Sequence, residues 1–359
     1  MKQRTIGFDV ARALAIFGMV IVNFKLAMGA TTGSAVLVQF SALFEGRASA
    51  LFVILAGVGV TFLTNAARVS SDLSVIARAR WLLVKRALLL IVLGLAYVPI
   101  WEADILHFYG FYFLIATMVF TVNDRGLLWV SAAIMLLFPV LMLLFDYGQN
   151  WNWQTLTYQN FWSIDGMVRH ILFNGFHPVF PWAAFLTFGM WLGRLDFSQT
   201  PVRKSLVVWS LGVLVVTEVM FYFLRDSLGQ GATTVLHREE VAFLLSTSII
   251  PPLPQYLLSA SSSAVVVLVA CVVVSERYAQ SRITQWLYVT GQLSLTLYVA
   301  HVVLGMGVLE VLGRLEGQSI EVSLLASLVF CLFGVGFSVA WLKFFRSGPL
   351  EWVFRKLAS

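Results

Sequence analysis

The sequence predicts an all-α fold, a polytopic transmembrane helix bundle of about ten helices, from three observations. Of the 359 residues, 59% are apolar or aromatic and only 12% are charged, whereas soluble proteins carry about 25% charged residues. Apolar runs of roughly 20 residues, long enough to cross about 30 Å of hydrocarbon, recur along the chain. The basic residues fall between these runs and do not share one amphipathic face. We therefore attribute the net charge of +6 to loops between membrane spans and not to a nucleic-acid-binding surface.

We expect the chain, 1–359, to form a single transmembrane domain. The sixth span begins with Pro178 and Pro181, so an irregular start is expected there. The first span contains Asp9 and Arg12 and lacks a small-residue cleavage pattern, so we expect it to remain in the mature protein. The predicted spans lie near 8–28, 48–67, 84–101, 105–122, 127–145, 180–195, 205–224, 256–275, 285–310 and 322–345.

The distribution of basic residues predicts the orientation. If the chain starts inside, 17 of the 24 Lys and Arg residues fall in cytoplasmic segments, six fall on the opposite side, and Arg12 lies within the first span. An excess of Lys and Arg marks the cytoplasmic side of a membrane protein. We therefore expect both the N- and C-termini in the cytoplasm and a multi-pass protein of the cell inner (cytoplasmic) membrane.

The two cysteines, Cys271 and Cys331, both lie in apolar runs. They are expected to pack as small side chains and not to form a disulfide or bind a metal. The sequence has no metal-ligand spacing, so no metal is expected.

Charged side chains near the ends of apolar spans are candidates for function, because a charge at mid-helix costs roughly 2.5–3.5 kcal/mol. Asp9 and Arg12 are three residues apart and can meet on one helix face. Either they form a local ion pair, or Arg12 helps to bind an anionic donor at the inner face. Glu45 and Arg47 can form a similar local pair, and Gly46 between them lets the backbone approach another group closely.

The second span continues with small residues, which favour tight helix packing. These are Ala48, Ser49, Ala50, Gly57 and Gly59. Glu218, in the outer half of the seventh span, needs a partner, which Arg47 or a histidine could supply.

Histidines provide the second set of candidates. His301 shares a helix face with Ser294 and Tyr298, at spacing i, i+4, i+7, in the outer half of its span. His107 begins the fourth span from the outside, and His177 opens the sixth. Two readings are open for each: a structurally satisfied histidine, or part of a proton-transfer site that faces the extracytoplasmic side.

The remaining histidines, His170 and His237, look like ordinary loop residues, although they too fall outside on this topology. The outer segment 146–179 is rich in Trp, Tyr and Asn. Its aromatic residues either anchor the membrane boundary or stack on a sugar or another polar acceptor.

Several segments, taken together and in order, resemble the heparan-alpha-glucosaminide N-acetyltransferase-like and YeiB-like bacterial membrane proteins. The segments are Arg4 to Met19 with Asn23, Glu45 to Gly59, Ile105-Leu106 with Tyr109-Gly110, Pro178 to Asp196, Gly291 to His301, and Gly348 to Trp352.

This resemblance implies a membrane acyltransferase that moves an acyl group, expected to be acetyl, from cytosolic acetyl-CoA to an extracytoplasmic acceptor such as an envelope sugar or amine. A histidine serves in that chemistry as a base or a nucleophile. The animal enzyme of the family has its active histidine between the first two helices, where this chain has none. His301, His107 or Glu45 is then expected to take the role.

The same resemblance suggests the other roles. Cofactor-binding residues for acetyl-CoA are expected among Arg12, Asp9 and Arg86. The expected substrate-binding residues are Arg47, His177, Tyr298 and Tyr109. Membrane lipid, acyl-CoA and a glycan or small-molecule acceptor are the expected partners, and the sequence leaves a homo-oligomer open.

Two other functions stay open. The first is a proton-coupled transporter or flippase of a small polar or lipid-linked substrate, in which the same charges couple to protons. The second is a non-catalytic scaffold in which those charges only pack.

Overall fold

The computed structural model describes residues 6–230 and 238–358, and within them the chain is helical except for one small hairpin. The hairpin pairs β1 (Trp151–Asn152) with β2 (Thr157–Tyr158) in antiparallel register. The helices are α1 (Ile6–Ala27), α2 (Ala35–Ala42), α3 (Arg47–Arg68), α4 (Leu73–Tyr97), α5 (Leu106–Val119), α6 (Asp124–Leu144), α7 (Ile164–Arg169), the π-helix η1 (His170–Asn174), α8 (Val179–Leu192), α9 (Thr200–Gln230), α10 (Arg238–Leu244), α11 (Pro254–Arg277), α12 (Arg282–Gln292), α13 (Ser294–Ala300), the π-helix η2 (His301–Met306), α14 (Gly307–Val311), α15 (Ile320–Trp341) and α16 (Pro349–Ala358).

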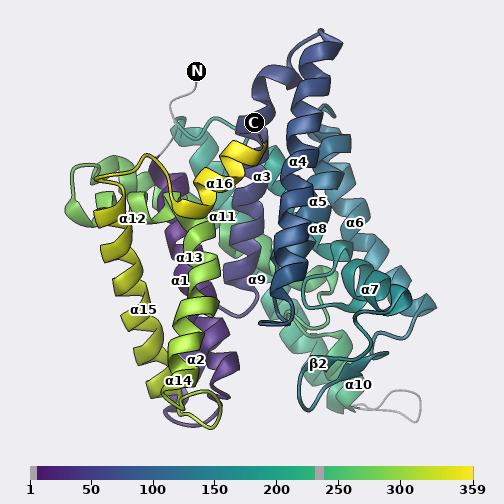
Figure 1. Ribbon diagram of the computed structural model, residues 1–359. Helices are drawn as coiled ribbons and strands as arrows, with labels where there is room; N and C mark the ends of the chain where they lie inside the picture. Colours follow the sequence, from purple (N-terminus) through teal and green to yellow (C-terminus); the bar gives the residue numbers. More distant parts are fainter. Residues whose placement is uncertain (1–5, 231–237, 359) are drawn as a thin grey trace.

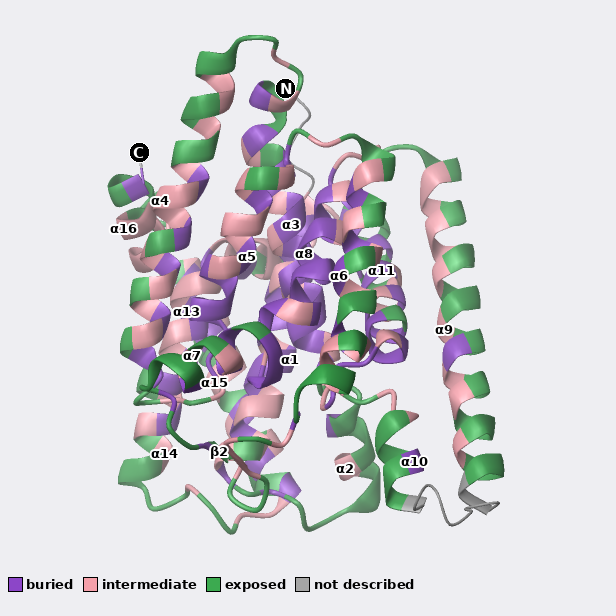
Figure 2. Ribbon diagram, turned by 90° about the vertical axis from the view of Figure 1, so that its right-hand side faces the viewer, coloured by how far each residue is buried: buried purple, intermediate pink, exposed green. Residues whose placement is uncertain are grey.

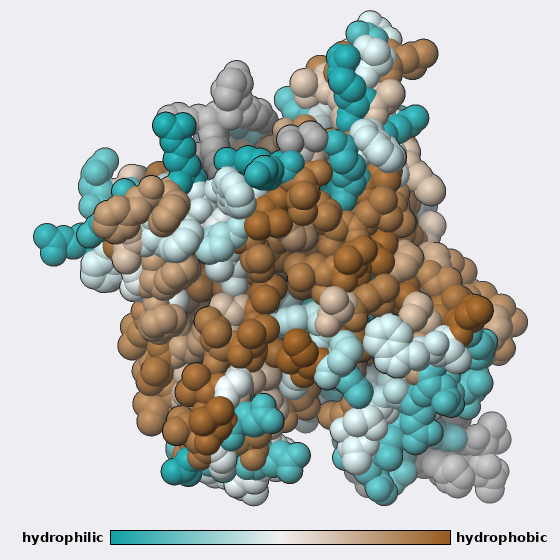
Figure 3. Space-filling view, viewed as in Figure 1, coloured by the Kyte–Doolittle hydropathy of each residue, from teal (hydrophilic) through white to brown (hydrophobic). Residues whose placement is uncertain are grey.

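The long helices run roughly parallel between two faces of the bundle (Figure 1). The start of α1, the α4–α3 turn and α16 lie at one face, which we call the terminal face. The hairpin, α7 and α10 lie toward the opposite face, which we call the loop face. On the side that Figure 3 shows, hydrophobic residues occupy the middle and hydrophilic residues gather at both faces. This banding is the surface expected of a protein that spans a membrane.

The predicted all-α transmembrane bundle is confirmed, and each of the ten predicted spans falls on a helix. Among the described residues, seven helices are long and apolar enough to cross a membrane, or up to eight if a bent pair counts as one span. The two remaining predicted spans are α4, whose first 14 residues include four basic ones, and α5, which has only 14 residues. Both are packed against each other in the bundle.

Two of the spans are broken. The sixth begins with α7 and η1, which are bent by 47° against α8, and Phe180 within α8 has non-helical dihedral angles. This confirms the irregular start that the prolines predicted. The ninth was predicted as one continuous helix, 285–310, and that prediction is wrong: the helix breaks at Leu293 between α12 and α13.

A carboxylate from the last helix caps the break. Oε1 of Glu351 accepts hydrogen bonds from the backbone N–H groups of Leu295, at 2.8 Å, and Thr296, at 3.1 Å. Oε2 accepts a hydrogen bond from Oγ1 of Thr296 at 2.6 Å. These bonds satisfy the donors that a helix start leaves free, and a negative charge is favourable there. The contact ties α16 to the bundle at the terminal face.

Glu351→Ala is expected to lower the free energy of unfolding by about 1–3 kcal/mol, because the part-buried N–H groups of Leu295 and Thr296 lose their acceptor. Burial raises the pKa of the Glu351 carboxyl, although its hydrogen bonds lower it in part. The folded state therefore holds this proton more tightly than the unfolded state, so stability falls as pH rises above the ordinary carboxyl range. Thermal unfolding in detergent as a function of pH measures both effects.

Glu351→Gln is the control, since it keeps one acceptor oxygen and removes the titrating group. It should lose less stability than Glu351→Ala and flatten the pH dependence. Equal melting temperatures for wild type and Glu351→Ala would contradict the capping role.

The core lies where α1, α3, α8 and α11 meet, shown by the buried residues in Figure 2. Gly57 of α3 and Gly189 of α8 lie at the crossing of these two helices. A Cβ atom added at Gly57 would overlap the carbonyl oxygen of Leu186, and one at Gly189 would overlap that of Ile54. The tight packing predicted for the second span is therefore confirmed at Gly57. At Gly59 it is not, because a Cβ there would meet only the Arg12 guanidinium, at 3.6 Å.

Candidate functional site

The site is built around Asp104 and His107 at the start of α5, both fully buried. Oδ2 of Asp104 accepts hydrogen bonds from the backbone N–H groups of Leu106, at 2.8 Å, and His107, at 3.3 Å. The same oxygen lies 3.1 Å from Nδ1 of His107. The aspartate thus caps the helix and orients the imidazole three residues later. Nε2 is then the ring nitrogen that is not bonded to Asp104.

A tyrosine from a distant helix completes this arrangement. The Tyr298 hydroxyl, on α13, donates to Oδ1 of Asp104 at 3.1 Å and accepts the backbone N–H of Ile105 at 3.1 Å. Both carboxylate oxygens of Asp104 are therefore engaged, one by His107 and one by Tyr298. This network fixes the position of the imidazole from two sides.

Three histidines, which we call the histidine cluster (His107, His170 and His177), gather around Phe108. The rings of His107 and His170 stack at 5.9 Å between centroids and 23° between planes. Phe108 lies 5.3 Å from His170 and 6.1 Å from His177. In the described part of the chain, no group of three or more His, Cys, Asp or Glu residues is arranged to hold a metal ion.

Several polar atoms at this cluster are buried without a hydrogen-bond partner. They are Nε2 of His107, Nδ1 of His170, Nδ1 of His177, and Nε1 of Trp182, whose ring lies 4.6 Å from that of His177. Most buried polar groups in proteins have partners, so a concentration of exceptions needs an explanation. A substrate or water that enters this region would supply the missing bonds.

A pocket of about 380 Å³ opens next to the cluster on the loop face. Its wall includes His170, the carboxylate residue Glu102, and the aromatic residues Tyr158, Phe161 and Trp162. Trp162 is 62% exposed. His170 therefore separates this pocket from His107, against which its ring stacks.

The other aromatic residues of the outer segment pack on one another. The rings of Trp151 and Trp153 stack at 4.9 Å, and Nε1 of Trp151 donates to the carbonyl of Asn174 at 2.6 Å. These rings support the loop structure, whereas Trp162 faces the pocket.

His301 differs from His107 in its hydrogen bonding. Its Nδ1 bonds to the carbonyl of Tyr298, and its Nε2 lies 2.9 Å from Nδ2 of Asn23 on α1. Both ring nitrogens therefore have partners. The spacing that predicted a shared face for Tyr298 and His301 does bring both into the core, but only Tyr298 contacts Asp104.

Asp9 and Arg12 form the local ion pair that their spacing allows. The Asp9 side chain is fully buried, whereas that of Arg12 is 18% exposed. Arg12 lies beside Gly59 of α3, and Phe52 is seven residues earlier on the same helix, about 10 Å along its axis. The Phe52 ring packs between Tyr109, at 5.6 Å, and Tyr298, at 6.3 Å. An aromatic layer thus lies between the Arg12 region and the Asp104–His107 pair.

The predicted local pair of Glu45 with Arg47 is wrong. Gly46 between them has a left-handed backbone (φ +69°) and turns the chain at the start of α3. Glu45 is exposed and pairs with Lys25 at 2.8 Å, while Arg47 turns inward and pairs with Glu218 of α9 at 2.7 Å. The partner predicted for Glu218 is thereby confirmed.

The close approach expected at Gly46 is also found, because its carbonyl accepts the Tyr256 hydroxyl at 2.8 Å. Arg47 joins α3 to α9 and α11 through Glu218, Ser259 and Ser263, so its contacts hold helices together. Arg86 is half-buried on α4.

Two residues of the site were not selected from the sequence. Asp104 stands three residues before His107, the same spacing that identified Asp9 and Arg12, so this signal was available. His170 was interpreted as a loop histidine, yet it is 2% exposed and stacked on His107. Nothing in its sequence neighbourhood indicates that contact. His237 lies outside the described residues.

Comparison with known families decides the classification. The family profile described as heparan-alpha-glucosaminide N-acetyltransferase, catalytic, matches residues 4–228, which are 225 of the 359 residues. The chain belongs to this acetyltransferase family. A second profile, described as a protein of unknown function (DUF418), matches residues 191–359. No match was found among curated proteins.

The acetyltransferase match contains Asp104 and the whole histidine cluster, as well as Asp9 and Arg12. Tyr298 and His301 lie only in the second match. The candidate site therefore draws its central pair from the acetyltransferase region and its supporting tyrosine from the C-terminal region.

Proposed function

We propose that the chain transfers an acyl group, expected to be acetyl, from acyl-CoA at the terminal face to an acceptor at the loop face. One observation carries the proposal: in a chain of the acetyltransferase family, Nδ1 of buried His107 is bonded to a carboxylate and its Nε2 has no partner. A histidine held in this way has one nitrogen ready to accept a proton.

In this proposal, Nε2 of His107 accepts the proton of the acceptor N–H or O–H as that group attacks the thioester carbonyl carbon. The imidazolium is stabilised by Asp104, which keeps its charge and its hydrogen bond to Nδ1. As the carbon–sulfur bond breaks, His107 returns the proton to the sulfur. His107 ends in its starting state, with one thioester consumed and one amide or ester formed.

The donor would approach from the terminal face. Its phosphates are anionic, and the proposal takes the terminal face as the cytoplasmic side, for which the sequence predicts the excess of Lys and Arg. Arg12 lies beside Gly59, about two helix turns from Phe52 of the aromatic layer, and is the proposed contact for the donor. The extended arm of CoA suits the distance of about 10 Å along α3 that separates Arg12 from Phe52.

The acceptor would approach through the pocket that His170 lines. Trp162 and Phe161 offer aromatic faces there, and Glu102 offers a carboxylate. His170 lies between the pocket and His107, so it is the proposed contact between the acceptor and the buried base.

The first test is donor binding. Acetyl-CoA is expected to raise the unfolding temperature of the detergent-purified protein, because a ligand that binds only the folded state stabilises it. Arg12→Lys should weaken that shift, because a lysine cannot form the two parallel bonds of a guanidinium, while its charge still faces Asp9. Arg78→Lys, at an exposed arginine of α4, is the matched control and should leave the shift unchanged.

Absence of any shift with acetyl-CoA or CoA would remove the main support for acyl transfer. Proton-coupled uptake into proteoliposomes without CoA would instead favour the transporter. Glucosamine serves as the first acceptor to be assayed, with release of free CoA thiol as the measurement.

A further inference from the structure

Helix α9 stands away from the rest of the bundle. Of its described side chains, only that of Thr217 is buried, and α9 packs chiefly along α11 and α10. Figure 2 shows it at one edge of the molecule, mostly exposed along its length. Its outward residues are large and apolar, among them Val208, Val216 and Phe223. A helix of this kind faces lipid on most of its surface.

Two ion pairs fasten α9 to α11 and α3. Near its start, Arg203 pairs with Glu276 of α11. Further along, Glu218 pairs with Arg47 of α3 and also accepts the Thr247 hydroxyl at 2.9 Å. The part of α9 between these two points has no such pair in the described contacts, and a groove lies beneath it.

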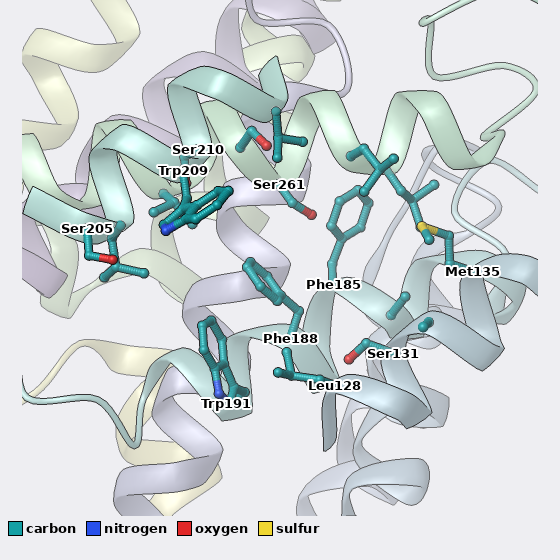
Figure 4. Close-up of a pocket in the computed structure, with 18 residues that line it drawn as sticks. Leu128, Ser131, Met135, Phe185, Phe188, Trp191, Ser205, Trp209, Ser210 and Ser261 are labelled. Carbon is teal, nitrogen blue, oxygen red and sulfur yellow. The ribbon is translucent and has the colours of Figure 1, made fainter. Parts of the chain in front are cut away.

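The groove has a volume of about 410 Å³ and lies between α6 and α9, with α8 and α11 as its other walls. Figure 4 shows the rings of Phe185, Phe188, Trp191 and Trp209 projecting into this space. Leu128, Trp209 and Leu258 at its margin are each more than one third exposed. The groove is therefore continuous with the lipid-facing surface of the bundle.

The lining of the groove is mainly apolar, and its polar side chains are Ser131, Ser205, Ser210, Ser261 and Ser262. None of its described residues is charged or a histidine. The hydroxyl of buried Ser131 is already bonded, to the Thr187 hydroxyl at 2.7 Å and, as donor, to the Leu127 carbonyl at 2.9 Å. The groove therefore offers no charge to an occupant, and aliphatic and aromatic side chains form most of its surface.

The volume excludes a helix from a second copy of the chain. A helix with its side chains is about 10–12 Å across, so this space would hold less than about one turn. A flexible hydrocarbon chain that enters from the surrounding membrane fits the opening, the lining and the volume.

We propose that one hydrocarbon chain of a membrane phospholipid occupies this groove and fills the space between α6 and α9. It joins the middle of α9 to the bundle where the two ion pairs do not reach. The site lies apart from the histidine cluster, so the inference does not depend on the acyltransferase function.

Neighbouring alanines of α6 provide a matched pair of variants. Ala132 lines the groove, whereas Ala133 is exposed and does not. Ala132→Phe should fill the groove, and Ala133→Phe adds the same ring outside it. Native mass spectrometry of the purified chain should show one retained phospholipid in the wild type and in Ala133→Phe, and none at this site in Ala132→Phe.

A second measurement uses the wild type alone, so it does not depend on the variant folding. A phospholipid with a photoreactive diazirine in one acyl chain, incorporated into proteoliposomes, should label peptides of α6 and α9 that line the groove. Labelling spread evenly over the lipid-facing helices, or equal lipid retention by both variants, would overturn the proposal. So would crosslinks in the groove between two copies of the chain.

Discussion

His107→Gln is expected to lower the rate of acyl transfer by about 10²–10⁴-fold, the usual contribution of a positioned general base. The glutamine side chain has nearly the same reach but cannot take up a proton at neutral pH. The measurement is CoA release with acetyl-CoA and glucosamine. The acetyl-CoA-dependent shift in unfolding temperature should remain, because His107 lies on the acceptor side of the aromatic layer.

Two further variants separate the roles around His107. Asp104→Asn should cause a loss of the same order, since an amide can present its NH₂ group to Nδ1 and favour the wrong tautomer. His301→Gln tests the alternative base, whose two ring nitrogens are already bonded to Asn23 and Tyr298. If His301→Gln abolished turnover while His107→Gln retained it, the assignment of the base would move to His301.

Gly57→Ala is expected to destabilise the bundle by at least about 1–3 kcal/mol, the usual effect of overpacking a core. Its added methyl group would overlap the Leu186 carbonyl oxygen and approach the Met190 nitrogen. Backbone atoms cannot move aside as a flexible side chain can, so α3 and α8 would have to separate. Because α8 carries Trp182 and lies beside His177, this separation should also reduce activity. The yield of monodisperse protein in detergent and its unfolding temperature measure the effect.

Gly59→Ala, two residues later on the same helix, is the matched control. Its methyl group would meet only the Arg12 guanidinium, at ordinary contact distance, and alanine favours a helix over glycine by about 1 kcal/mol. The two substitutions should therefore have opposite signs of effect on stability. Equal losses for both would mean that the α3–α8 crossing is not the tight contact described here.

The transmembrane class followed from the sequence, and so did His107, His177 and Tyr298 as candidate site residues. Hydropathy predicts the membrane spans because the entry of an apolar run into lipid does not depend on which residues pack beside it. Local spacing was equally informative, since Asp9 and Arg12 meet within one helix turn as predicted. Predictions of side-chain pairing failed where a residue distant in the sequence is the actual partner. Arg47 pairs with Glu218 and not with Glu45, because Gly46 turns the chain between Glu45 and Arg47.

The break at Leu293 was missed for a similar reason, since its cap is the carboxylate of Glu351, far along the chain.

The choice among the histidines also needed the tertiary structure. In the sequence, His301 looked stronger than His107, because it shares a helix face with Tyr298. The fold gives His301 two hydrogen-bond partners and brings Tyr298 instead to Asp104, beside His107. Helix formation depends on contacts within a few residues and can therefore be predicted from the sequence. Which imidazole nitrogen is left unpaired depends on side chains from separate helices, and only their packing decides that.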